Sequence, residues 1–122
     1  MRENTKLRGA WGEELAARYL KNKGYAVVGL NYRVRGGEID VIAQDRQNLV
    51  FAEVKTRKSG RFAEAREYVT YAKRQRLILA ARLYLAANPT DKQPRFDVIE
   101  IYDPGGSAPE INHIENAFSE EG

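Results

Sequence analysis

The sequence predicts an α/β fold in which helices cover a mixed β-sheet. Two segments carry apolar residues at helical spacing, whereas the other apolar segments are short and rich in β-branched and aromatic residues, as strands are. Their order along the chain is helix, three strands, helix and strand, which favours a sheet packed against helices. With 122 residues, the chain suits a single domain, 1–122, built around a hydrophobic core.

The first helix is expected at residues 9–23, and Gly24 ends it. At about 100° per residue, its apolar face comprises Trp11, Leu15, Ala16, Tyr19 and Leu20. Residues 25–34 follow as a strand, with a bulge expected at Gly29. Two further strands are expected at about 38–44 and 49–56.

A long helix is expected at about 64–87, after the loop "KSGRFAEA". The segment "RFDVIEIY" then predicts a further strand, and "EINHIENAF" predicts a last short strand or arm. We expect residues 116–122, which end in "SEEG", to form a flexible tail.

Composition indicates a globular, mildly basic protein. Hydrophobic residues make up 43% and charged residues 30%, which excludes a disordered chain, and the net charge is +3 at pH 7. The absence of cysteine excludes disulfides and thiolate metal sites. No apolar run approaches the roughly 20 residues of a membrane span, and the charged start "MRENTKLRGAWGEE" lacks the apolar core of a signal peptide. We therefore expect a cytoplasmic protein with no membrane partner.

The stretch "RGGEIDVIAQDRQNLVFAEVKTR" contains acidic residues inside otherwise apolar strands. We expect its two strands to form an antiparallel hairpin that turns through "QDRQN". If Asp45 pairs with Asn48, the loop is Arg46–Gln47 and the numbers of paired residues sum to 93.

This register places Asp40 opposite Glu53 and Glu38 opposite Lys55, with all four side chains on one face. Directly opposed residues have Cβ atoms about 4.5–5.5 Å apart, where like charges repel. Carboxylates in an apolar strand need a partner, so this pair indicates a bound cation. Oxygen ligands alone favour Mg²⁺ or Mn²⁺, and a nearby lysine can orient or deprotonate a water molecule or neutralise a phosphate.

A structural salt bridge at a strand end explains the same residues, and an Asp/Glu-x-Lys triplet arises by chance in a chain this acidic. Two helices add candidates. Glu13 lies at the margin of the first helix's apolar face and can reach the sheet, although a glutamate in a first helical turn is also favoured by the helix dipole. Lys73 lies on the apolar stripe of the long helix, where it either snorkels to solvent or approaches the acidic cluster.

The sequence resembles the PD-(D/E)xK nuclease superfamily, and in particular the YraN family of uncharacterised bacterial proteins, which are similar to archaeal Holliday-junction resolvases. The matching segments are "GAWGEELAARYL", "GEIDVIA", "LVFAEVKTR", "VTYAKRQRLILAARLYL", "RFDVIEI" and "HIENAF". The resemblance implies a restriction-endonuclease-like αβββαβ core with a mixed sheet flanked by helices. It also implies a Mg²⁺-dependent (or Mn²⁺-dependent) endonuclease that acts on DNA.

Carried onto this sequence, the family pattern implies four catalytic residues, of which the three acids are metal ligands: Glu13, Asp40, Glu53 and Lys55. Ile39 stands where the superfamily pattern has proline. Basic residues around these positions are expected to contact DNA: Arg35, Arg57, Lys58, Lys73 and Arg74. For the stretch "TRKSGRF", a charged, solvated loop is the alternative explanation.

We expect the substrate to be DNA, branched in the resolvase version, and the protein to form a homodimer because junction cutting needs two sites. The alternative is a catalytically inactive nucleic-acid-binding module of the same fold, and a weaker alternative is a protein-interaction partner. Two other polar features are expected to be structural. For Arg95 and Asp97 we expect a strand-end salt bridge, with support of the site from behind its ligands as the alternative for Asp97. For His113 we expect a surface or capping position and no catalytic role.

Overall fold

A computed structural model describes residues 5–57, 69–103 and 108–120, with side chains from residue 9 onward. Its elements follow the expected order: α1 (Thr5–Asn22), β1 (Ala26–Val34), β2 (Gly37–Gln44), β3 (Asn48–Arg57), α2 (Tyr71–Ala87), β4 (Gln93–Tyr102) and β5 (Glu110–Phe118). The helix, three strands, helix and strand of the sequence prediction are therefore confirmed, and the segment "EINHIENAF" is a strand.

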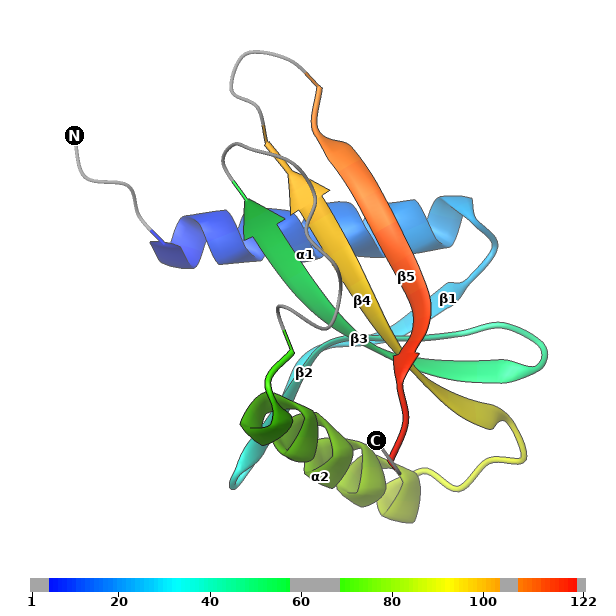
Figure 1. The fold of residues 1–122 in the computed structure, drawn as a ribbon. Coiled ribbons are helices and arrows are strands. Elements are labelled where there is room, and N and C mark those ends of the chain that lie inside the picture. Colours follow the sequence, from blue (N-terminus) through cyan, green and yellow to red (C-terminus); the bar gives the residue numbers. More distant parts are fainter. Residues whose placement is uncertain (1–4, 58–68, 104–107, 121–122) are drawn as a thin grey trace.

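The five strands form one mixed sheet in the order β1-β2-β3-β4-β5. β3 and β4 are parallel, and the other neighbouring strands are antiparallel. A parallel pair needs a crossover connection, and α2 lies within the one between β3 and β4. Figure 1 shows α1 and α2 on opposite faces of the sheet. The α/β class with helices flanking a mixed sheet is confirmed.

Each helix covers its own apolar cluster. The cluster under α1 includes Ala16, Leu20, Val41, Val50 and Ile99. The cluster under α2 includes Ile42, Phe51, Leu77, Phe96 and Val98. Strand β3 contributes alternate residues to both clusters, which is why "LVFA" reads as a continuous apolar run. Glu53 follows directly on this buried run.

Helix α2 begins later than its sequence pattern indicates. Val69 and Thr70 are not helical, and residues 64–68 of the predicted helix lie outside the described residues. Thr70 is the N-cap, because its backbone is extended and its Oγ1 accepts a hydrogen bond from the Lys73 amide at 3.2 Å. The cap fixes Lys73 in the first turn of the helix. At the other terminus, α1 begins at Thr5, four residues before the expected start.

Two irregularities interrupt the outer strands. The register between β1 and β2 shifts between Val27 and Gly29, so the predicted bulge at Gly29 is confirmed. The register between β4 and β5 shifts near Asn116, which has a φ of 52°. Strand β5 takes up the first three residues of the expected tail, since it ends at Phe118, whose side chain is buried.

Gly37 allows α2 to lie directly against the beginning of β2. A Cβ atom at this position would overlap the backbone oxygen of Arg76 and would lie 3.3 Å from the Cβ of Ala80. The N-terminal half of α2 is therefore held against the strand that carries Asp40. No helix in the described ranges 5–57, 69–103 and 108–120 is long and apolar enough to cross a membrane.

The close approach at Gly37 predicts that Gly37→Ala destabilises the protein by about 1–3 kcal/mol, because the added methyl group must push the α2 backbone away. Gly9→Ala is the matched control. A Cβ at Gly9 meets nothing within 4 Å, and alanine should stabilise the α1 helix by up to about 1 kcal/mol. Urea unfolding of the three proteins measures both effects. Equal stabilities of the Gly37→Ala variant and the wild type would show that α2 does not pack this closely.

Candidate functional site

The β2–β3 hairpin has the predicted register. Its ladder pairs run from Val41 with Ala52 to Gln44 with Leu49, and the numbers of each pair sum to 93. Asp45 closes the turn, because its amide donates to the Asn48 carbonyl at 3.0 Å and its Oδ1 accepts from the Asn48 amide at 2.7 Å. The loop is therefore Arg46–Gln47, as the turn residues predict.

The ladder ends before it reaches the predicted Asp40–Glu53 and Glu38–Lys55 pairs. Instead, the Asp40 carboxylate accepts a hydrogen bond from the Val54 amide at 2.8 Å, and so replaces a backbone acceptor on β2. The prediction that Asp40 pairs with Glu53 and Glu38 with Lys55 in the β2–β3 ladder is therefore wrong.

The reason is a local irregularity of β2 at Asp40. Ile39 packs in the cluster under α2 and Val41 in the cluster under α1, although residues two apart in a regular strand share a face. On β1, the residue between the neighbouring pairs is Asn31, which has a φ of 51°. The strand therefore turns over at Asp40, and the side chain bonds to β3 in place of the backbone.

Glu53 is the buried acid of the site, with a side chain that is 3% exposed. The Lys73 ammonium of α2 lies 2.6 Å from its Oε1, and the Lys55 ammonium lies 3.6 Å from the same oxygen. A buried carboxylate without a partner destabilises a fold by several kcal/mol. Because Glu53 is buried, it needs the positive charge of these lysines. Of the two contacts, only that of Lys73 has the length of a charge-assisted hydrogen bond.

The electrostatics show that the two acids interact. Burial, the negative charge of Glu53 and, more weakly, the charge of Glu13 raise the pKa of Asp40 to about 7, against the lowering effect of the Val54 amide. Burial and the neighbouring Lys73 charge lower the pKa of Lys55. Although burial disfavours its charged form, the hydrogen bond to Glu53 raises the pKa of Lys73. Lys73 is thus the firmly charged member of the lysine pair.

The structure brings Asp40, Glu53, Lys55 and Lys73 together, whereas the ion pairs of Glu38 are with other residues. Glu38 is ion-paired with Arg33 at 3.7 Å and Arg76 at 3.9 Å.

Glu13 is half-buried on α1 and influences Asp40 through its charge. Within the described ranges, no three His, Asp or Glu side chains are grouped tightly enough to hold one ion. Two carboxylates do fit Mg²⁺, which is usually held by one or two carboxylates together with waters and substrate phosphates.

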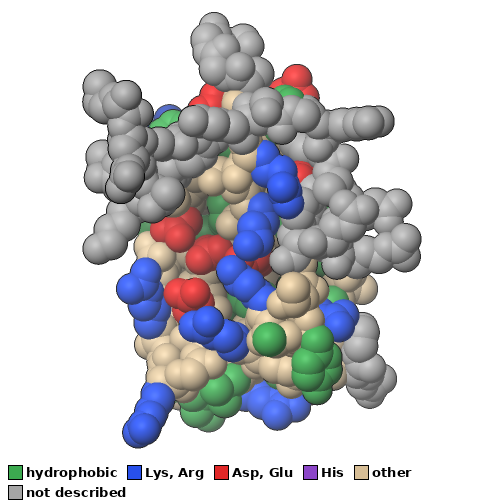
Figure 2. Space-filling model, turned by 60° about the vertical axis from the view of Figure 1, so that its left-hand side comes forward, with side chains coloured by type: hydrophobic (Ala, Val, Ile, Leu, Met, Phe, Trp, Pro, Cys, Tyr) green, Lys and Arg blue, Asp and Glu red, His purple; other side chains and the backbone are tan. Residues whose placement is uncertain are grey.

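Figure 2 shows one face of the molecule on which acidic side chains lie among lysine and arginine side chains. Among the predicted DNA contacts, Arg74 is half-buried at the start of α2 and Arg35 is exposed between β1 and β2. Arg57 is 41% exposed and ion-paired with Glu100 at 3.4 Å. Lys58 lies outside the described residues.

Glu100 was missed by the sequence analysis. It is fully buried on β4 beside Lys55, and it accepts a hydrogen bond from Asn112 at 3.4 Å. The available signal was an isolated acid within the apolar run "DVIEIY".

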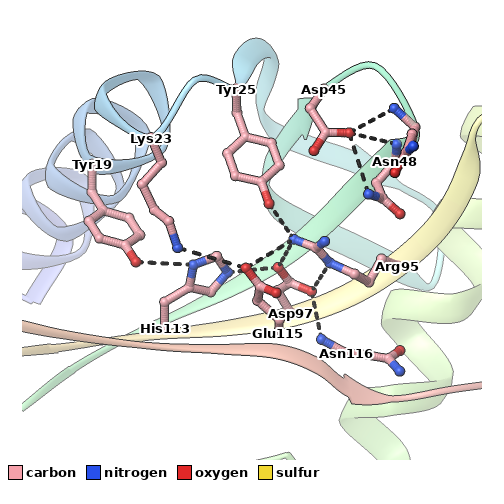
Figure 3. A network of polar contacts seen from close by, with 11 residues as sticks. Tyr19, Lys23, Tyr25, Asp45, Asn48, Arg95, Asp97, His113, Glu115 and Asn116 are labelled. Carbon is pink, nitrogen blue, oxygen red and sulfur yellow. Dashed lines mark hydrogen bonds and ion pairs between the residues drawn. The ribbon is translucent and has the colours of Figure 1, made fainter.

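A second polar cluster surrounds Asp97 (Figure 3). Arg95 binds both carboxylate oxygens of Asp97, each at 2.9 Å, which confirms the expected salt bridge. His113 is also there, with its Nε2 at 2.7 Å from Asp97 and its side chain 2% exposed. The expected surface position of His113 is therefore wrong, because the ring is needed to satisfy a buried carboxylate.

The remaining contacts favour a structural role for the Asp97 cluster. Asp97 accepts the amide of Asn116 at 2.9 Å, while His113 Nδ1 lies 3.2 Å from the Tyr19 hydroxyl. Despite burial, the hydrogen bonds from His113 and Arg95 lower the pKa of Asp97. Every oxygen of this carboxylate has a donor, and the cluster joins β4, β5 and α1.

Asp40 and Asp97 predict opposite pH dependences. Because the folded protein holds the Asp40 proton more tightly than the unfolded chain does, wild-type stability without divalent metal should fall as pH rises from about 4 to 7. Asp40→Asn removes the charge and keeps an acceptor for the Val54 amide. This variant should therefore exceed the wild type by a few kcal/mol at pH 8 in EDTA. Urea unfolding across pH, with the exposed Asp91→Asn as control, measures this difference. Parallel pH curves would contradict the raised pKa of Asp40, and with it the combined effect of burial and the Glu53 charge.

The lowered pKa of Asp97 has the reverse sign. Its contribution is present above the unfolded pKa near 3.8 and is lost as pH falls through the lower folded value. Asp97→Asn should destabilise the protein at pH 7 by about 3–5 kcal/mol, because Arg95 and His113 lose a buried partner. The same unfolding experiments should show the loss shrinking below pH 4. A variant with wild-type stability at pH 7 would refute this structural role.

Comparisons with known proteins place the chain in a family. Residues 12–101 match the model described as uncharacterised protein family UPF0102. A UPF0102 protein of Syntrophomonas wolfei subsp. wolfei is 47% identical over 111 residues, which cover 90% of this chain and 96% of the relative. One of Alkaliphilus oremlandii is 48% identical over 113 residues, with the same coverage of each chain. One of Nocardia farcinica is 45% identical over 111 residues, covering 90% of this chain and 87% of the relative. The chain therefore belongs to the uncharacterised protein family UPF0102, the YraN family that its motifs resemble.

Proposed function

We propose that this protein is a divalent-metal-dependent endonuclease of the PD-(D/E)xK superfamily that hydrolyses phosphodiester bonds in DNA. The observation that carries the proposal is that Asp40, which is half-buried on β2, interacts with the buried Glu53 of β3, beside Lys55. Each acid raises the cost of charge on the other, as the pKa of Asp40 shows. A divalent cation between them relieves that cost, and the acid–acid–lysine set is the one that the sequence motifs imply.

In this proposal Asp40 and Glu53 hold Mg²⁺ or Mn²⁺, and Glu13 assists from α1. The bound ion supplies Lewis acidity toward a phosphate and toward a water molecule. Lys55 orients or deprotonates the attacking water, a role for which its lowered pKa suits it. Arg35, Arg57 and Arg74 contact DNA phosphates in this proposal, and Lys58, outside the described residues, stays a predicted contact.

A purely structural salt bridge is the competing explanation of Glu53. A buried ion pair is weak evidence for stability, because apolar residues of similar volume often stabilise a core equally well. Here the pair lies next to a third charged group, Asp40, whose carboxylate is destabilised by its surroundings. Groups with strongly shifted pKa values in such clusters are characteristic of functional sites.

The proposed substrate is DNA, with branched DNA in the resolvase-like version, and the proposed compartment is the cytoplasm. Cutting two strands of a junction symmetrically needs two sites, so this version requires a homodimer. The alternative is an inactive nucleic-acid-binding module of the same fold. One observation favours it: the Lys73 ammonium already satisfies Glu53 at 2.6 Å.

Cleavage of labelled linear and branched DNA in Mg²⁺ or Mn²⁺ tests the proposal. Glu53→Gln should lower the cleavage rate at least about 100-fold, because a neutral amide is a poor ligand for a hard cation. Lys55→Met should lower it by about 100-fold or more while leaving metal binding in place. Glu115→Gln, which neutralises an exposed carboxylate, is the control and should cleave at the wild-type rate.

The same assays separate the alternatives. If the wild type binds DNA but neither binds metal in calorimetry nor cleaves, the inactive binding module replaces the nuclease. Cleavage that survives in folded Glu53→Gln protein would refute the assigned site. A sharp monomer at working concentration would remove the resolvase version.

A further inference from the structure

One of the acids proposed to hold the metal, Glu53, is already bound by a lysine ammonium. The Lys73 ammonium lies 2.6 Å from Glu53 Oε1, closer than the ammonium of Lys55 at 3.6 Å. Its positive charge also acts on Asp40, where it partly offsets the effects that raise the pKa of that carboxyl. Lys73 is therefore near both acids, and it neutralises the more deeply buried one.

Local structure does not explain a lysine at this position. Lys73 is in the first turn of α2, which has no acidic residue, and a cation there is opposed by the helix dipole. The Thr70 cap holds the Lys73 amide, so the backbone is fixed and only the side chain can move. The position of Lys73 thus weakens the first turn of α2, and its ion pair with Glu53 on the sheet compensates for that.

The Lys73 side chain is also partly exposed to solvent. It is 33% exposed, whereas the Glu53 side chain is 3% exposed, so the lysine reaches the buried acid from the solvent side. Arg74, a second basic residue in the first turn of α2, follows it directly in the chain. An ammonium displaced from Glu53 would lie beside any phosphate bound there.

We propose that Lys73 is an internal counter-ion that occupies the place of the metal in the free protein and transfers to a substrate phosphate when the metal binds. The proposal rests on the proposed function. A divalent cation must compete with the ammonium for Glu53, so free protein binds metal weakly. Phosphate gives the displaced ammonium a new partner, so nucleic acid strengthens metal binding. By thermodynamic linkage, metal strengthens nucleic-acid binding by the same factor.

Calorimetric titration of Mg²⁺ and Mn²⁺ into the protein without DNA tests the competition. Lys73→Met should bind metal at least about tenfold more tightly than the wild type, because the competing charge is gone. Lys23→Met is the matched control, since it removes the same charge from an exposed ion pair with Glu115 at 3.7 Å, and its metal affinity should equal that of the wild type. Equal affinities of the Lys73→Met variant and the wild type would overturn the proposal.

Thermal unfolding in EDTA gives a second measurement that does not require tight metal binding. Lys73→Met should unfold at a lower temperature than the wild type, and added Mg²⁺ should restore more of its stability. In a Glu53→Gln background, Lys73→Met should have little effect, because a neutral amide needs no counter-ion. Additive losses in the double variant would show that Lys73 stabilises the helix by other contacts, and would overturn the proposal.

The coupling is tested with a phosphorothioate-linked oligonucleotide, which resists hydrolysis. It should tighten Mg²⁺ binding to the wild type by at least about fivefold, and by much less in Lys73→Met. Loss of metal binding in Asp40→Asn with no change in Lys73→Met would leave the metal site standing and refute the counter-ion. Metal binding that depends on neither Asp40 nor Glu53 would refute the proposed function itself.

Discussion

The burial of Glu53 is the constraint on which the arrangement of the site depends. Glu53 directly follows the buried run of β3 that packs against both helices. Water therefore cannot solvate its charge, and another side chain must compensate it. The nearest compensating charge comes from α2, the helix in the crossover between β3 and β4. Gly37 lets that helix lie against β2, and Thr70 fixes where it begins. One acid in a central strand thus links the starting point of a helix, a glycine contact and a lysine.

Asp40 and Asp97 have the same backbone role in opposite surroundings. Each accepts an amide hydrogen bond where a strand departs from regular pairing, Asp40 from Val54 and Asp97 from Asn116. Asp97 is also bound by Arg95 and His113, so its charge is fully compensated. Asp40 faces another carboxylate instead. The negative charge of Asp97 is therefore compensated within the sheet, whereas that of Asp40 is not. The uncompensated aspartate lies in the candidate site.

The sequence predicted most of the fold because its signals are local. The hairpin register followed from Asp45 and Asn48, whose turn geometry depends only on neighbouring residues. The alternation of apolar residues in turn placed Glu53 on a face of the sheet.

The rest depended on contacts between distant segments. The irregularity at Asp40 arises where β1, β2 and β3 lie side by side, and nothing in the sequence "GEIDVIA" predicts it. The late start of α2 depends on the Thr70 cap, and the burial of His113 depends on Asp97, sixteen residues away. Lys73 was recognised as a candidate on the helix stripe, but only the packing of α2 on β2 shows that it reaches Glu53.

Both edges of the sheet carry an asparagine with positive φ: Asn31 in β1 and Asn116 in β5. A residue in this conformation turns the backbone away from the extended path, so neither edge offers an unbroken row of amides and carbonyls to an incoming strand. Without this interruption, the exposed apolar side chains of Val28 and Leu30 on β1 would favour association of that edge with another strand. We therefore expect little strand addition at either edge of the sheet. In the homodimer of the resolvase version, we expect the two subunits to meet through helix or loop surfaces and not through one continuous sheet.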